Sequence, residues 1–103
     1  MLDASPDQLA IVLDILRKHV PHREAWAFGS RAKVTAWRYS DLDLAIAGET
    51  LLPFDVRGGM AEGFSESDLP FRVDILDWAT TRDNVRRIVE ADKIVIQVAG
   101  PAV

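Results

Sequence analysis

Two short segments decide the fold of this chain: FGSRAK at residues 28–33 and SDLDL at residues 40–44. Successive side chains of a β-strand point to opposite faces, so a strand through the second segment puts Asp41 and Asp43 on one face. Their Cα atoms then lie roughly 6.5–7 Å apart. Both carboxylates can therefore reach one hard cation, or two cations side by side.

A Gly-Ser turn precedes this carboxylate pair, with the ten residues 31–40 between Ser30 and Asp41. Gly29 lets the backbone turn sharply, and we expect Ser30 to cap a short helix that begins at the next residue. Backbone N–H groups at a helix start suit a phosphate. A phosphate site beside a carboxylate-held cation indicates nucleotide chemistry.

A third carboxylate is predicted on a later strand, in the segment FRVDIL at residues 71–76. Aspartate is depleted in β-strands, so Asp74 in this β-rich run indicates a functional residue. We expect Asp77 to be a strand-end or capping residue, because strand alternation points its side chain to the face opposite that of Asp74. Trp78 is expected to be a core or interface aromatic.

The pattern of Gly-Ser, ten residues, Asp-x-Asp and a later strand-borne Asp resembles the signature of the minimal nucleotidyltransferases, a branch of the DNA polymerase β-like nucleotidyltransferase superfamily. The resemblance runs over nearly the whole chain. It implies that Asp41 and Asp43 hold Mg²⁺, as one or two ions. It also implies that Asp74 either ligates a second metal or accepts the proton of the incoming hydroxyl.

The same resemblance implies a nucleotide-binding set around the turn. Gly29 and Ser30 would hold the outer phosphates and the pyrophosphate leaving group. Arg31 and Lys33 are candidates for contact with the triphosphate, and Ser40 is expected to cap or orient the carboxylate that follows it.

By resemblance, the expected reaction is transfer of AMP from ATP to an acceptor hydroxyl, with release of pyrophosphate. Minimal nucleotidyltransferases pair with a helical HEPN-domain protein, often an RNase toxin. The leading hypothesis is an antitoxin that adenylylates a tyrosine of that toxin. Two alternatives stay open: the catalytic subunit of a two-chain small-molecule transferase, acting for example on an aminoglycoside, and a non-catalytic antitoxin that only binds its partner.

The sequence departs from the family pattern at two positions. Val34 stands where the family often has Gly, and Trp37 stands where a basic residue is common, with Arg38 following. Either the loop is rebuilt and Arg38 takes over, or triphosphate binding is weaker.

Size and composition fit a single domain spanning residues 1–103, with 49% hydrophobic residues and a net charge of −4. That charge argues against direct nucleic-acid binding. No apolar run long enough to span a membrane is present, and no secretory signal is apparent at the N-terminus. The absence of cysteine is compatible with a cytoplasmic protein. A homo- or hetero-oligomer is possible.

The expected fold is a small mixed α/β (α+β) sheet with helices mainly on one face and the Asp-bearing face open to nucleotide. A capping box at Ser5 and Gln8 begins the first helix, which ends near Val20. Thr80 or Thr81 is expected to cap the last helix. The expected elements are a helix at 5–20, strands at 24–28, 41–47, 71–76 and 93–98, a helix after Pro53, and a last helix with Val85, Ile88 and Val89 inward.

Overall fold

The computed structural model describes residues 2–33, 36–37 and 39–100. Its elements are helix α1 (Pro6–His19), strand β1 (Ala25–Phe28), strand β2 (Leu42–Ile46), helix α2 (Phe54–Glu66), strand β3 (Val73–Asp77), a 3-10 turn (Trp78–Thr80), helix α3 (Asp83–Asp92) and strand β4 (Ile94–Gln97). The predicted α+β fold with a mixed sheet is confirmed.

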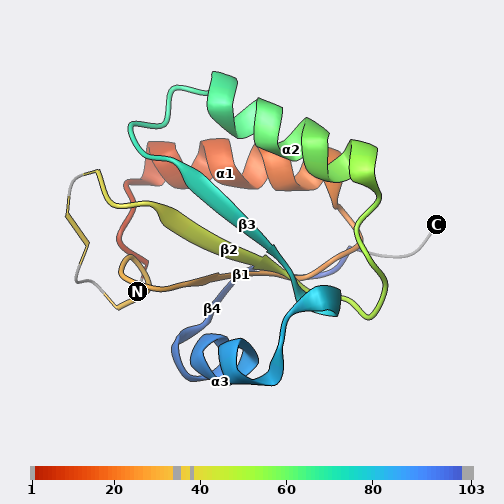
Figure 1. The fold of residues 1–103 in the computed structure, drawn as a ribbon. Coiled ribbons are helices and arrows are strands. Elements are labelled where there is room, and N and C mark those ends of the chain that lie inside the picture. The colour runs from red at the N-terminus through yellow and green to blue at the C-terminus, as the bar shows by residue number, and fades with distance from the viewer. Residues whose placement is uncertain (1, 34–35, 38, 101–103) are drawn as a thin grey trace.

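The strands form one four-stranded sheet in the order β3-β2-β1-β4 (Figure 1). β1 runs antiparallel to both of its neighbours, whereas β2 and β3 are parallel. Parallel neighbours need a crossover connection, and α2 supplies it, as expected from the sequence. β4 is an edge strand, which the sequence also predicted.

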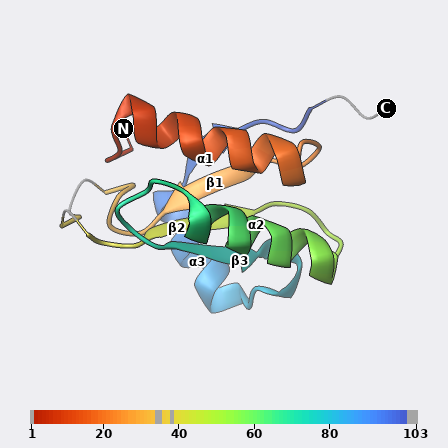
Figure 2. The same ribbon diagram turned by 90° about the horizontal axis from the view of Figure 1, so that it is seen from above.

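The two faces of the sheet are covered unequally. α1 and α2 lie side by side over one face, where Leu42, Leu44 and Ile46 are fully buried (Figure 2). α3 lies against the opposite face, where Ala45 is buried with Val89. The expectation of an open Asp-bearing face is therefore right for only one end of that face, because α3 covers the other end.

Helix α1 begins as its sequence predicts. The Ser5 hydroxyl accepts a hydrogen bond from the Gln8 backbone N–H at 3.1 Å, and the Gln8 side chain accepts one from the Ser5 N–H at 3.0 Å. Pro6 occupies the first helical position. The helix ends at His19, and Val20 closes it by donating to the Leu16 carbonyl.

Helix α2 begins directly after Pro53, as predicted, in spite of its glycines. A methyl group on Gly59 would lie 3.0 Å from the His19 ring of α1. The missing side chain therefore lets the two helices approach closely, which offsets part of the roughly 1 kcal/mol that glycine costs in a helix.

Two predictions at the end of β3 are confirmed. The Asp77 carboxylate accepts from the Ala79 N–H at the start of the 3-10 turn and from the Leu52 N–H at 2.9 Å. Asp77 is thus a buried capping residue. Trp78 packs edge-to-face on Trp26 with ring centroids 4.7 Å apart, as a core aromatic would.

Three local predictions are wrong. The segment after Gly29 is a turn over residues 30–33 rather than the start of a regular helix. The Thr80 and Thr81 hydroxyls donate to the Asp77 carbonyl, and Arg82 stands at the N-cap of α3 without a side-chain cap. Ile88 is 56% exposed, so it does not face the core.

Gly100 is hydrogen-bonded to the segment that follows α1. Its backbone N–H donates to the Pro21 carbonyl at 2.9 Å. The predictions for Val34, Arg38 and residues 101–103 lie outside the described residues. Among the helices that the structure describes, none is both long and apolar enough to cross a membrane.

Candidate functional site

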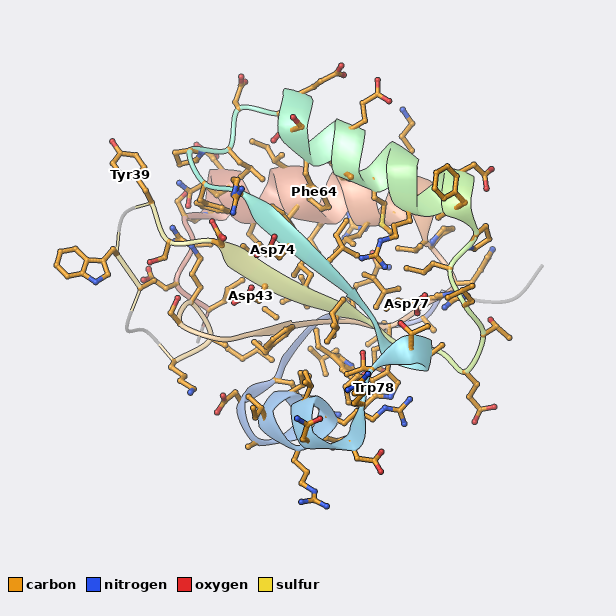
Figure 3. All side chains as sticks on the ribbon, in the orientation of Figure 1. Tyr39, Asp43, Phe64, Asp74, Asp77 and Trp78 are labelled. Carbon is orange, nitrogen blue, oxygen red and sulfur yellow. The ribbon has the colours of Figure 1, made fainter. Side chains whose placement is uncertain are left out.

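The centre of the site is a pair of carboxylates on adjacent strands. β2 and β3 pair in parallel with Asp43 directly opposite Asp74, so both side chains lie on the same face. The backbones of paired strands are only about 4.8 Å apart. Both residues lie toward the same end of the sheet, while Asp77 and Trp78 lie at the other end of β3 (Figure 3). Asp43 is half-buried and Asp74 is exposed.

The predicted turn meets this pair from the neighbouring strand. β1 pairs with β2 so that Phe28 lies opposite Asp43, and the next residue, Gly29, has φ +76°. A Cβ atom built on Gly29 would overlap Asp43 Oδ2. Only glycine fits here, because the backbone is left-handed and because a carboxylate occupies the space of a side chain.

The negative charges of Asp74 and Asp41 repel the charge of Asp43. Burial raises the pKa of Asp43 above its ordinary value, and the negative charges of Asp74 and then Asp41 raise it further. A cluster of this kind is stabilised by a positive charge brought among the three groups.

One positive charge already lies at the edge of the cluster. The Arg72 guanidinium is 3.4 Å from Asp41 Oδ2, and its side chain is 82% exposed. Arg72 is not among the site residues that were predicted from the sequence. A signal was present, since Arg72 lies two residues before Asp74 and strand alternation places both on one face.

The donor set fits a hard cation in its chemistry, because carboxylate oxygens are the ligands that Mg²⁺ takes. In the part of the chain that the structure describes, no three His, Cys, Asp or Glu side chains are already grouped closely enough to hold a metal ion. Asp43 and Asp74 lie next to each other on adjacent strands, but the Asp41 carboxylate is paired with Arg72. Cation binding would therefore draw Asp41 away from Arg72.

The turn that follows Gly29 is closed by its own backbone. The N–H groups of Ala32 and Lys33 both donate to the Gly29 carbonyl, at 3.1 and 3.2 Å. Ser30 lies inside this turn, directly after the glycine that contacts Asp43. The structure thus brings the predicted phosphate-binding residues Gly29 and Ser30 to the carboxylates, as the spacing required.

Arg31 lies in a different environment from the one expected of a triphosphate ligand. It is only 4% exposed, and its guanidinium stacks 3.9 Å from the centre of the Phe71 ring. Its Nε donates to the Ser40 carbonyl and its Nη1 to the Asp3 carbonyl, both at 2.9 Å. These contacts favour a structural role that joins the N-terminal segment to the loop before β2.

Lys33 and Ser40 also have defined partners. The Lys33 ammonium lies 3.0 Å from Asp92 at the end of α3. The Ser40 hydroxyl accepts from the Trp37 N–H at 2.8 Å, and the Ser40 N–H donates to the Trp37 carbonyl at 3.0 Å. Ser40 therefore closes a turn directly before Asp41, and its expected orienting role stays a prediction.

A carboxylate pair in register on parallel strands, with a left-handed glycine turn against it, is an arrangement that suits metal-assisted chemistry on phosphates. Comparison with known families agrees with this class of chemistry. A family model described as Polymerase beta, Nucleotidyltransferase matches residues 12–98, and the chain belongs to this nucleotidyltransferase family.

Individual relatives refine the comparison. The chain is 54% identical over 96 residues to "Probable protein adenylyltransferase MntA" of Haemophilus influenzae, covering 93% of this chain and 84% of MntA. A chain in a crystal structure of a toxin–antitoxin with AMP-PNP superposes with a TM-score of 0.74 at 23% identity, covering 88% of this chain and 73% of that one.

A second solved structure is similar in fold. It is a tri-AMPylated Shewanella oneidensis HEPN toxin in complex with MNT antitoxin, matched with a TM-score of 0.66 at 19% identity over 88% of this chain and 70% of that one. At such low identity the two solved structures support the fold alone. The relationship to MntA, at 54% identity, is much nearer.

Proposed function

We propose that this chain is an antitoxin that transfers AMP from ATP to a tyrosine hydroxyl of a HEPN-domain partner, with Mg²⁺. The similarity to a protein named as an adenylyltransferase supports the choice of reaction. The choice of partner follows the pairing in one structure of similar fold, a HEPN toxin in complex with MNT antitoxin.

The observation that carries the proposal is the position of Asp43. It lies between the left-handed turn at Gly29 on one side and Asp74 on the other. The turn that we propose binds phosphate is therefore in direct contact with the carboxylate pair. Transfer of a nucleotidyl group requires this proximity, because the turn must hold the phosphates while the carboxylates neutralise charge beside them.

Each residue of the site has a role in this reaction. Asp41, Asp43 and Asp74 would hold Mg²⁺, which supplies charge neutralisation at the phosphate oxygens when bound. Gly29 and Ser30 bind the outer phosphates through the turn. Asp74, the most exposed carboxylate of the three, is placed to accept the proton of the incoming hydroxyl.

The tyrosine oxygen forms a bond to the α-phosphorus of ATP, and the bond between that phosphorus and the bridging oxygen to the β-phosphate breaks. Pyrophosphate leaves with the electron pair of the broken bond. The phenolic proton passes to a carboxylate and then to solvent, which leaves AMP on the tyrosine as a phosphodiester.

The acceptor comes from outside the chain. The described residues form one sheet covered by three helices, and they leave Asp74 open to solvent. An exposed carboxylate at the end of the sheet can receive a side chain from a separate polypeptide. A helical partner that presents a tyrosine meets this requirement.

The experiment is a rescue assay with the HEPN-domain protein encoded beside this chain. Cells that express the toxic partner are given the wild-type chain, the Asp43→Asn, Asp74→Asn double variant, or no antitoxin. We expect rescue by the wild type only, and loss of rescue when the modified tyrosine of the partner is replaced by phenylalanine. Full rescue by the double variant, with both proteins still bound, would make this chain a binding antitoxin without catalysis.

A further inference from the structure

The whole chain contains a single tyrosine, Tyr39, and it stands two residues before Asp41. Its side chain is 66% exposed. A tyrosine hydroxyl is the acceptor group that the proposed function uses. The site therefore carries, on its own border, one copy of the chemical group on which it acts.

The backbone around Tyr39 is held in place. Trp37 and Ser40 close a turn across it through two hydrogen bonds, at 2.8 and 3.0 Å. The buried Arg31 then binds the carbonyl of Ser40. Tyr39 is thus presented from a turn that is anchored at its base to the interior of the protein.

The ring projects away from its own site. Two residues of chain span at most about 7 Å between the Cα atoms of Tyr39 and Asp41. Yet the ring lies beyond the carboxylate end of the sheet and points outward, away from Asp43 and Asp74 (Figure 3). The ring therefore faces away from the carboxylates of its own chain.

We propose that Tyr39 is an AMP acceptor in trans, modified by a second copy of this chain. The inference rests on the proposed function and extends it to a second protein substrate. The Tyr39 oxygen bonds to the α-phosphorus of ATP held by the other copy, and pyrophosphate leaves. The phenolic proton passes to Asp74 of that other copy, and AMP remains on Tyr39 as a phosphodiester.

Mixing two variants tests this directly. One chain carries Asp43→Asn and Asp74→Asn, so it keeps Tyr39 and the Arg72–Asp41 ion pair but has no active site. The other carries Tyr39→Phe, so it keeps the site but lacks the acceptor. The two are given tags of different mass, incubated with ATP and Mg²⁺, and weighed by intact mass spectrometry. The HEPN partner is incubated with the Tyr39→Phe chain in parallel.

We expect one AMP on the site-inactive chain, none on the Tyr39→Phe chain, and none on a site-inactive chain that also carries Tyr39→Phe. AMP on the partner but on neither copy would overturn the inference and leave the proposed function standing. AMP on the triple variant would also overturn it, because another hydroxyl would be the acceptor. No AMP on any protein, the partner included, would remove the proposed function and this inference together.

Discussion

Gly29 and Asp43 are in close contact, because the Asp43 carboxylate occupies the space that a side chain on residue 29 would fill. The contact joins the end of β1 to the beginning of β2, which are antiparallel neighbours. It makes the turn at Gly29 and the carboxylate pair one structural unit. Changes to either residue should therefore affect stability and catalysis together.

Gly29→Ala should be destabilising and inactivating. A left-handed backbone costs a non-glycine residue about 1–3 kcal/mol, and the new methyl group must also displace Asp43 Oδ2. Urea unfolding measures the first effect and AMP transfer to the partner measures the second. Gly58→Ala in α2 is the matched control. No atom lies within 4 Å of its added methyl group, so it should gain roughly 0.5–1 kcal/mol and keep full activity.

Asp43→Asn should raise the thermal unfolding temperature of the metal-free chain at pH 7, on the order of a few °C for a domain of this size. The pKa of Asp43 is raised in the folded state by burial and by the charges of Asp74 and Asp41. Between the unfolded pKa of about 3.9 and the raised folded value, the folded chain binds more protons than the unfolded chain. Its stability therefore falls as the pH rises through that window.

The asparagine variant loses this dependence, so its advantage over the wild type should vanish below about pH 4. Differential scanning calorimetry between about pH 3 and pH 8, with a chelator present, measures how the unfolding temperature of each chain depends on pH. Asp68→Asn, at an exposed position between α2 and β3, controls for the loss of one charge. If the wild-type chain were more stable than Asp43→Asn at pH 7, the charged Asp43 carboxylate would not destabilise the folded chain.

Arg72→Gln should strengthen binding of a divalent cation to the nucleotide-free chain. Arg72 pairs with Asp41 in the structure, so the cation must compete with it. Exposed ion pairs contribute about 0.2–1 kcal/mol, which corresponds to a gain in affinity of at most about five-fold. Manganese binding, followed by electron paramagnetic resonance, reports the affinity without any catalysis.

The gain from Arg72→Gln should shrink as salt rises, because the pair is open to solvent. Arg87→Gln removes an equal charge from an exposed position on α3 and should have little effect. Weaker manganese binding in Arg72→Gln would contradict the competition between Arg72 and the cation.

Arg31→Lys should destabilise the chain nearly as much as Arg31→Ala, by about 2–4 kcal/mol, because lysine cannot serve several carbonyls and stack on Phe71 at once. Lys33→Ala breaks only the exposed pair with Asp92 and should cost at most about 1 kcal/mol. Unfolding in guanidinium measures the free energy of unfolding of the Arg31 variants and of Lys33→Ala. ATP affinity per folded molecule tests whether Arg31 also contacts the triphosphate. If it does, replacing Arg31 should lower the ATP affinity even where the variant is fully folded.

Local sequence signals predicted most of the elements correctly. The capping box of α1 and the alternation of apolar residues in β2 depend on neighbours in the chain, and both are confirmed. The spacing between Ser30 and Asp41 predicted that the turn and the carboxylates meet. The register of Asp43 against Asp74, which the sequence could only suggest, is settled by strand pairing.

The errors concern contacts between distant segments. Ala45 shares the face of Asp43 and was expected to be open, but α3, which lies some forty residues further along the chain, buries it. The contacts of Arg31 with the Phe71 ring and the Asp3 carbonyl were likewise not predicted, because nothing nearby in the sequence indicates them. Partners of this kind are determined by the tertiary fold rather than by propensity.

Transfer of AMP by this chain to a HEPN partner would raise the mass of that partner, so the mass of the partner is the measurement to make. Purified partner is incubated with the chain, ATP and Mg²⁺, and weighed intact. We predict a gain of one or more AMP units with the wild type and none with the Asp43→Asn, Asp74→Asn variant. A partner that keeps its original mass while bound in a stable complex with the wild-type chain would contradict the proposed transfer.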